Sequence, residues 1–184
     1  MPPKAKISRE KILSAAVDVV RERGAEKLTA KAVAAKLKCS TQPVFWYYEN
    51  MEALKRDVFG EAMARFSFRL RAPRSDCASP YMGVGLNYIA FATEEKELFK
   101  LLFMSGIGGR DMLSSNVERE YILEVMERSD SVTGAKAENI YREMWLFSHG
   151  IAAMTVTDTA RFTDEEIRNM LSRVYRGLLT LDNI

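Results

Sequence analysis

The stretch LTAKAVAAKLKCSTQPVFWYY, residues 28–48, has the pattern of two short helices joined by a tight turn. Thr29 is placed to cap the first helix, whose apolar residues recur on one side. A turn at residues 38–39 follows. Ser40 is placed to cap the second helix, and Pro43 lies in its first turn, where the missing N–H costs no helical hydrogen bond. This pairing is the helix-turn-helix arrangement, whose second helix enters the major groove of DNA.

The rest of the chain also has the apolar spacing of helices rather than of strands. We therefore expect an all-α protein of about nine helices. A polar loop bounded by prolines, residues 71–80, separates the first four helices from the others. The expected helices cover residues 8–24, 29–37, 40–48, 50–70, 81–92, 94–104, 111–128, 135–157 and 163–181.

Charge is distributed unevenly along the chain. The 184 residues include 27 basic and 25 acidic side chains, for a net charge of +2. Residues 1–55 contain 11 of the basic side chains and only 6 of the acidic ones. The N-terminal segment is therefore basic and the remainder mildly acidic, which favours a polyanion as the partner of the N-terminal segment.

The composition also argues against several classes of protein. Cys39 and Cys77 are too few for a disulfide framework, and His149 is the one histidine, so we expect no metal and no cofactor. Because no acid–base pair or nucleophile stands out, we expect no enzyme. The chain also lacks a long apolar run and an N-terminal secretion signal, so we expect a cytoplasmic protein that does not enter membranes.

The start of the second short helix carries the side chains suited to reading DNA. Gln42 can pair with adenine through two hydrogen bonds, and the hydroxyls of Ser40 and Thr41 can bond base edges. Helix geometry directs Trp46 and Tyr47 toward the side opposite the core, which makes them further candidates for DNA contact. Lysines flank the unit and can neutralise phosphates.

Residues 8–58 resemble the DNA-binding head of the TetR (tetracycline-repressor-like) transcriptional regulators. The resemblance rests on ILSAA at 12–16, RG at 23–24, LT at 28–29, VA at 33–34, STQPVFWYY at 40–48 and NMEAL at 50–54. The run WLFSHG at 145–150, followed by TDEE at 163–166, resembles the last two helices of that family, which usually build a dimer interface.

The resemblance implies a helix-turn-helix domain at residues 1–54 and a helical regulatory domain at residues 55–184, for ligand binding and dimerisation. It further implies a homodimeric, ligand-responsive repressor of transcription. Such a repressor binds a palindromic operator in double-stranded DNA and is released by a small effector. The DNA-binding candidates are Lys31, Ser40, Thr41, Gln42, Trp46, Tyr47 and Lys55.

The head departs from the family at three positions that usually contact the DNA backbone. The family often has Tyr in place of Phe45, His in place of Tyr47 and Lys in place of Met51. Phe45 cannot donate a hydrogen bond and Met51 cannot neutralise a phosphate, so backbone affinity is either lower or depends on Lys31, Lys55 and the tail residues Lys4 and Lys6. A helical adaptor, or a small helical enzyme, whose head no longer binds DNA is therefore the alternative.

The expected body is rich in aromatic and methionine side chains, which suit an adaptable apolar cavity for a small hydrophobic effector. Ordinary core packing is the alternative for each of them. The charged candidates nearest to these side chains are Arg119, Glu124 and Arg142. The ligand-binding candidates are Phe66, Phe99, Phe103, Met112, Tyr121, Met126, Met144 and Phe147. The dimer-interface candidates are Trp145, His149, Ala152, Ala153, Val156, Ile167, Leu171, Val174 and Leu178.

Overall fold

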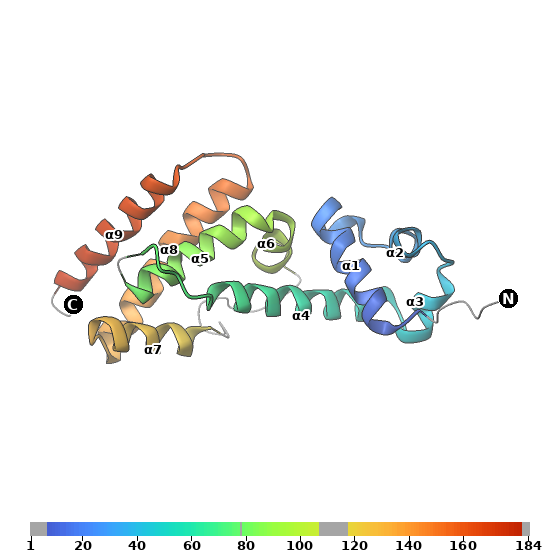
Figure 1. The fold of residues 1–184 in the computed structure, drawn as a ribbon, viewed down its shortest axis with the longest axis horizontal. Helices are drawn as coiled ribbons and strands as arrows, with labels where there is room; N and C mark the ends of the chain where they lie inside the picture. The colour runs from blue at the N-terminus through green and yellow to red at the C-terminus, as the bar shows by residue number, and fades with distance from the viewer. Residues whose placement is uncertain (1–6, 78, 107–117, 182–184) are drawn as a thin grey trace. The chain divides into compact units, whose positions relative to one another are not determined.

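The computed structural model describes residues 7–77, 79–106 and 118–181 (Figure 1). Over these ranges it contains nine α-helices, one 3-10 helix and no strand, which confirms the all-α prediction. The α-helices are α1 (Arg9–Arg23), α2 (Ala30–Leu37), α3 (Gln42–Tyr47), α4 (Met51–Leu70), α5 (Pro80–Glu94), α6 (Lys96–Phe103), α7 (Arg119–Asp130), α8 (Gly134–Val156) and α9 (Asp164–Thr180). The 3-10 helix η1 spans Ala25–Lys27. The first residues of the helix expected at 111–128 lie outside the described ranges.

The chain forms two compact units. The head unit comprises Met1–Arg65 with Glu95–Gly108, and the body unit comprises Phe66–Glu94 with Gly109–Ile184. This division differs from the boundary expected at residue 54, because α4 continues without a break for 20 residues and contributes to both units. Helix α6 belongs to the head unit, where it packs against α1.

Local sequence signals set the ends of the head helices. The hydroxyl of Ser8 accepts a hydrogen bond from the Lys11 amide at 3.3 Å and caps α1. The hydroxyl of Thr29 accepts one from the Ala32 amide at 3.1 Å and caps α2, as expected. Lys38 ends α2 in the left-handed conformation, at φ 53°, and so forms the expected turn.

A paired set of charges joins α1 to α6 inside the head unit. Arg21 donates through Nε and Nη2 to the two carboxylate oxygens of Glu95, both at 2.7 Å. This two-bond geometry is the strong form of an arginine–carboxylate pair. Helix α6 therefore helps to fix the position of α1, against which α2 and α3 pack.

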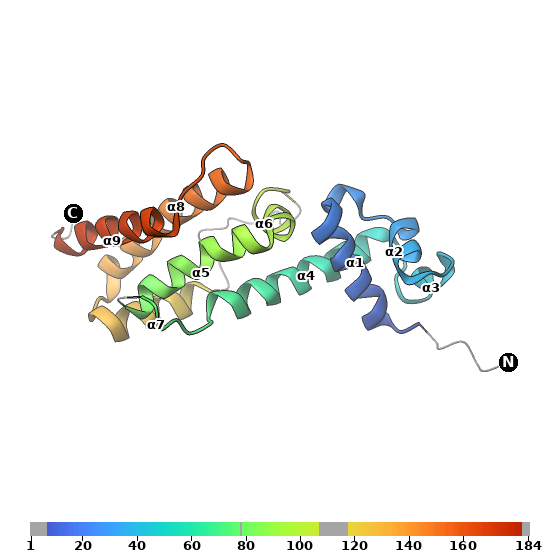
Figure 2. The same cartoon turned by 45° about the horizontal axis from the view of Figure 1, so that its top comes forward.

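Helix α5 lies at the centre of the body unit. It packs against α7, α8 and α9, and Figure 2 shows it running beside α8. Its apolar side chains supply much of the body core, including Phe91, which is fully buried. No helix in the described part of the chain is long and apolar enough to cross a membrane.

Asn87 of α5 is a buried polar residue in this core. Its amide nitrogen donates to the carbonyl oxygens of Leu70, at 3.1 Å, and of Ala72, at 2.7 Å. Its amide oxygen accepts from Nη1 of Arg69 at 2.6 Å and lies 3.4 Å from Nη1 of Arg74. One side chain thus satisfies the carbonyl of Leu70, which ends α4 without a helical partner, and the carbonyl of Ala72 in the turn that follows.

Replacing Asn87 with alanine should lower the free energy of unfolding by about 1–3 kcal/mol per buried group left without a partner. The carbonyl groups at the end of α4 and the two arginines all lose a hydrogen-bond partner. Urea unfolding followed by circular dichroism measures the change. Asn169→Ala, at an exposed position of α9, is the matched control. Equal stabilities of the two variants would contradict this account.

Candidate nucleic-acid interface and effector pocket

The N-cap of α3 is not the residue expected from the sequence. Thr41, rather than Ser40, stands at the N-cap, and its side chain makes no capping hydrogen bond. The predicted cap at Ser40 is therefore wrong: the N-cap position falls on Thr41, whose own angles are φ −73° and ψ −16°, and the structure shows no capping hydrogen bond from a side chain there. Ser40, Thr41 and Gln42 are all exposed, so their polar groups face away from the head core.

The aromatic run divides between the core and the surface. Val44 and Tyr48 are buried in the head core. Phe45 is 50% exposed and Trp46 is 61% exposed, which is unusual for such large apolar side chains. Together with the exposed polar start of α3, they give the helix an outer face of a kind that can meet base edges and thymine methyl groups.

Tyr47 has a structural contact that the sequence did not reveal. Its hydroxyl donates a hydrogen bond to the carbonyl oxygen of Ile7 at 3.0 Å. This bond joins α3 to the segment that precedes α1. The Tyr47 hydroxyl is therefore engaged within the head unit, and a phosphate contact would have to replace or share that bond.

The lysines of the head differ in their availability. Lys31 lies exposed on α2 and has no ion pair within the described residues. Lys55 pairs with Glu52 at 2.8 Å, and Lys36 pairs with Glu22 at 2.5 Å. Exposed pairs of this kind contribute little and exchange readily, but they lower the local positive charge. Lys31 is thus the more available phosphate-binding candidate.

The expected ligand-binding residues do not form one cluster. Phe99 and Phe103 belong to the head unit, where their ring centroids are 4.8 Å apart. Phe66 and Met126 are buried in the body core, and Met112 lies outside the described residues. The spacing of aromatic residues along the chain identified buried positions, but it did not show which of them border empty space.

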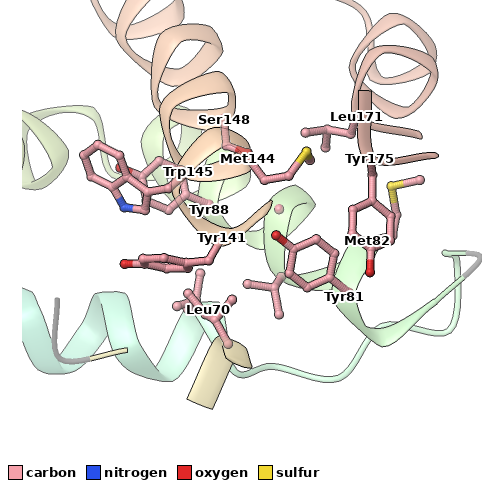
Figure 3. Close-up of a pocket in the computed structure, with 13 residues that line it drawn as sticks. Leu70, Tyr81, Met82, Tyr88, Tyr141, Met144, Trp145, Ser148, Leu171 and Tyr175 are labelled. Carbon is pink, nitrogen blue, oxygen red and sulfur yellow. The ribbon is translucent and has the colours of Figure 1, made fainter. Parts of the chain in front are cut away.

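A pocket does lie within the body unit, and Figure 3 shows the side chains around it. Its cavity is small, at about 40 Å³. Of the eight candidates, Met144 is the one that lines it. The lining residues are Leu70, Tyr81, Met82, Val84, Gly85, Tyr88, Ile122, Tyr141, Met144, Trp145, Ser148, Leu171 and Tyr175. Four of them are tyrosines, two on α5, one on α8 and one on α9, and none of these four was among the expected ligand-binding residues.

The pocket is lined by no charged residue. Burial raises the pKa of Tyr81 and of Tyr88 well above the usual tyrosine value, so both hydroxyls stay protonated. Tyr81 stacks against Tyr175, with ring centroids 4.5 Å apart. Tyr175 in turn donates to Asp130 at 2.7 Å. These rings form flat apolar walls with a few neutral polar groups.

His149 lies beside this pocket on α8. Its Nδ1 is 2.9 Å from the hydroxyl of Tyr88, and its ring stacks on Trp145 at 4.8 Å. Burial lowers the pKa of His149, so the ring is uncharged near neutral pH. The expected place of His149 in a dimer interface is untested, but the structure gives it a contact within its own unit.

The pKa of His149 predicts a pH effect on stability. The unfolded chain takes up a proton near the ordinary histidine pKa of about 6.5 more readily than the folded chain does. The contribution of the uncharged His149 ring to the free energy of unfolding is therefore fully present above that pH and is lost as the pH falls below it. Between pH 7 and pH 5, urea unfolding should show a larger loss of stability in the parent than in His149→Gln. Equal losses would contradict the prediction.

The expected dimer face requires a correction. Ala152, Val156, Ile167 and Leu171 are buried within the body unit, so they contact their own chain. The reason is that the apolar stripes of α8 and α9 pack on α5. The outer face of the pair keeps three of the expected residues, Ala153, Val174 and Leu178, and adds Leu146, Gly150, Met154 and Gly177.

Comparisons with known proteins agree with the geometry of the head. Residues 12–58 match the family model described as bacterial regulatory proteins, tetR family. No curated protein matches the sequence.

Solved structures share the fold along almost the whole chain. A TetR-like transcriptional regulator from Rhodococcus sp. RHA1 matches at a TM-score of 0.70 and 18% identity, over 97% of this chain and 99% of that one. BioQ of Mycobacterium smegmatis matches at 0.60 and 15% identity, over 93% and 97% of the two chains. The multidrug binding protein EbrR, complexed with imidazole, matches at 0.53 and 16% identity, over 90% and 93%.

The match to the family model falls within residues 8–58, the stretch that carries the resemblance to this family. The head matches the tetR family in sequence, and the chain has the fold of TetR-like transcriptional regulators.

Proposed function

We propose that this chain, with its tetR-family head and TetR-like fold, is a repressor that binds a palindromic operator as a homodimer and leaves it when a small effector binds the body. The observation that carries the proposal is the outer face of α3. That helix presents polar side chains at its start and the exposed Trp46 beside them.

In this proposal α3 enters the major groove. Gln42 pairs with an adenine, Ser40 and Thr41 bond neighbouring base edges, and Trp46 packs against thymine methyl groups. Lys31 neutralises a phosphate and fixes the position of the head without reading sequence. Two heads related by twofold symmetry would read two half-sites about one helical turn apart.

The dimer would form through the outer faces of α8 and α9. Leu146 is 52% exposed and Met154 is 49% exposed, and both lie on one side of α8 with Gly150 between them. A side chain added at Gly150 or Gly177 would meet nothing within 4 Å in the protomer, so a partner helix has room to approach closely there. A twofold pairing of these faces would give a four-helix bundle.

Release from DNA requires that the effector bind one conformation of the protein better than the other. A shift from nearly all binding-competent to nearly all incompetent needs differential affinity of about 5.5 kcal/mol. The aromatic pocket of the body unit is the proposed site for the apolar part of that molecule. Its small cavity means that side chains around it move when a ligand enters.

Selection from a library of random DNA duplexes tests the proposal and supplies an operator. We expect enrichment of an inverted repeat. Gln42→Ala should then cost about 1–3 kcal/mol at the selected site and relax the preference at one base pair of each half-site. Enrichment of no sequence would contradict the proposal and favour the helical adaptor, for which the apolar Phe45 and Met51 are the supporting observation.

Lys31→Ala should weaken binding to all duplexes alike and lower the slope of log affinity against log salt by about one unit per head. The slope is measured by fluorescence anisotropy across a salt titration. Arg161→Ala removes an exposed charge from the loop between α8 and α9 and is the matched control. An unchanged slope in Lys31→Ala, or equal slopes in both variants, would exclude Lys31 from the interface.

Leu146→Arg should convert the dimer into a monomer, because two arginines would face each other across the proposed twofold axis. Sedimentation equilibrium at micromolar concentration measures the mass. Phe68→Arg, on α4, changes a side chain that is 81% exposed and lies outside the proposed face, so that variant should stay dimeric. A monomeric parent, or a dimer in both variants, would refute this interface.

A further inference from the structure

A second and larger cavity lies in the body unit, with a volume of about 510 Å³. Three arginines line it, namely Arg71, Arg74 and Arg128, and no acidic side chain is among its lining residues. Leu70, Val84 and other apolar side chains line the remainder. The cavity thus combines positive charge with apolar surface, unlike the neutral aromatic pocket.

Two of the arginines are held in place by carboxylates. Arg71 donates through Nε to Glu118 at 2.7 Å, and its guanidinium lies 4.7 Å from the centre of the Tyr121 ring. Arg74 donates to both oxygens of Asp76, at 2.8 Å and 2.6 Å. These pairings fix the two guanidinium groups and compensate most of their charge.

Arg128 differs from them. Its Nε donates to the carbonyl oxygen of Glu124 at 3.3 Å, and it has no carboxylate partner within the described residues. Its terminal amino groups therefore have donor capacity to spare. One uncompensated positive charge at an arginine-lined cavity matches one negative charge on a ligand, and the planar guanidinium suits a carboxylate through two parallel hydrogen bonds.

The two cavities are neighbours. Leu70 at the end of α4 and Val84 of α5 line both of them. A molecule whose anionic end lies beside Arg128 can therefore extend its apolar end toward the aromatic pocket by displacing two aliphatic side chains. No polar group has to leave its hydrogen bonds for this to happen at Leu70 or Val84.

We propose that the body unit binds an apolar carboxylate, with the carboxylate beside Arg128 and Arg71 and the apolar chain directed past Leu70 and Val84 into the aromatic pocket. That this ligand is the effector rests on the function proposed above. The inference adds a charged end to the expected small hydrophobic effector, at arginines that the expected charged candidates did not include.

The test is calorimetric binding of decanoate and of decan-1-ol, which share a chain and differ in charge. We expect the parent to bind decanoate at least about tenfold more tightly than the alcohol, the change that 1.4 kcal/mol makes. Arg128→Gln should remove that preference and leave binding of the alcohol unchanged. Equal affinities of the parent for the two compounds, or no binding of either, would overturn the proposal.

Arg176→Gln is the matched control, because Arg176 of α9 makes the same kind of bond, from Nε to the carbonyl oxygen of Ser172 at 3.3 Å, away from the cavity. It should keep the parent's preference for decanoate. Equal loss in the Arg128 and Arg176 variants would show a general effect of surface charge and overturn the site. Tighter binding of decyl phosphate than of decanoate would overturn the choice of a carboxylate.

The experiments can contradict the ligand site and the proposed function independently of each other. Decanoate binding that depends on Arg128 would establish the site even if no operator is enriched from the duplex library. Conversely, an enriched operator whose binding is unaffected by decanoate, in a protein that shows the charge preference, would sustain the site and contradict its link to DNA release. Operator binding with no carboxylate preference would overturn the site alone.

Discussion

The side-chain amide of Asn87 is the interaction on which the body unit depends. It lies on the central helix α5 and bonds the carbonyl groups of Leu70 and Ala72 and the side chains of Arg69, within α4, and Arg74, beyond it. Because Arg69 also pairs with Glu94, and Arg74 with Asp76, this one amide connects the end of a long helix to a network of charges. Both cavities are bordered by residues next to that network, so their walls depend on it as well.

In the head unit, the stabilising contacts lie outside the helix that carries the proposed DNA-binding surface. Helix α3 is short and begins without a side-chain cap, so its polar residues remain directed outward rather than being used for its own stability. The surrounding helices compensate through well-formed caps at Ser8 and Thr29 and through the charge pair of Arg21 with Glu95. The surface that reads DNA in our proposal is thus supported by interactions outside it.

Sequence reasoning succeeded where structure is local. The caps at Ser8 and Thr29, and the capping box of Thr163 with Glu166, each join residues three positions apart, and the Thr29 cap was predicted from the sequence. It failed where distant segments meet. Arg71 and Arg128 are far apart in the chain, and nothing in either segment alone shows that they border one cavity. The apolar stripes of α8 and α9 were identified, but not which helix would bury them.

The shared wall of Leu70 and Val84 has a consequence for ligand discrimination. These two branched aliphatic side chains form a partition between the arginine-lined cavity and the aromatic pocket, and a ligand can displace them. Short anions would occupy the charged side and leave the partition in place, whereas molecules beyond a certain chain length would have to push it aside. The body unit would then discriminate between ligands by the length of their apolar chain as well as by their charge.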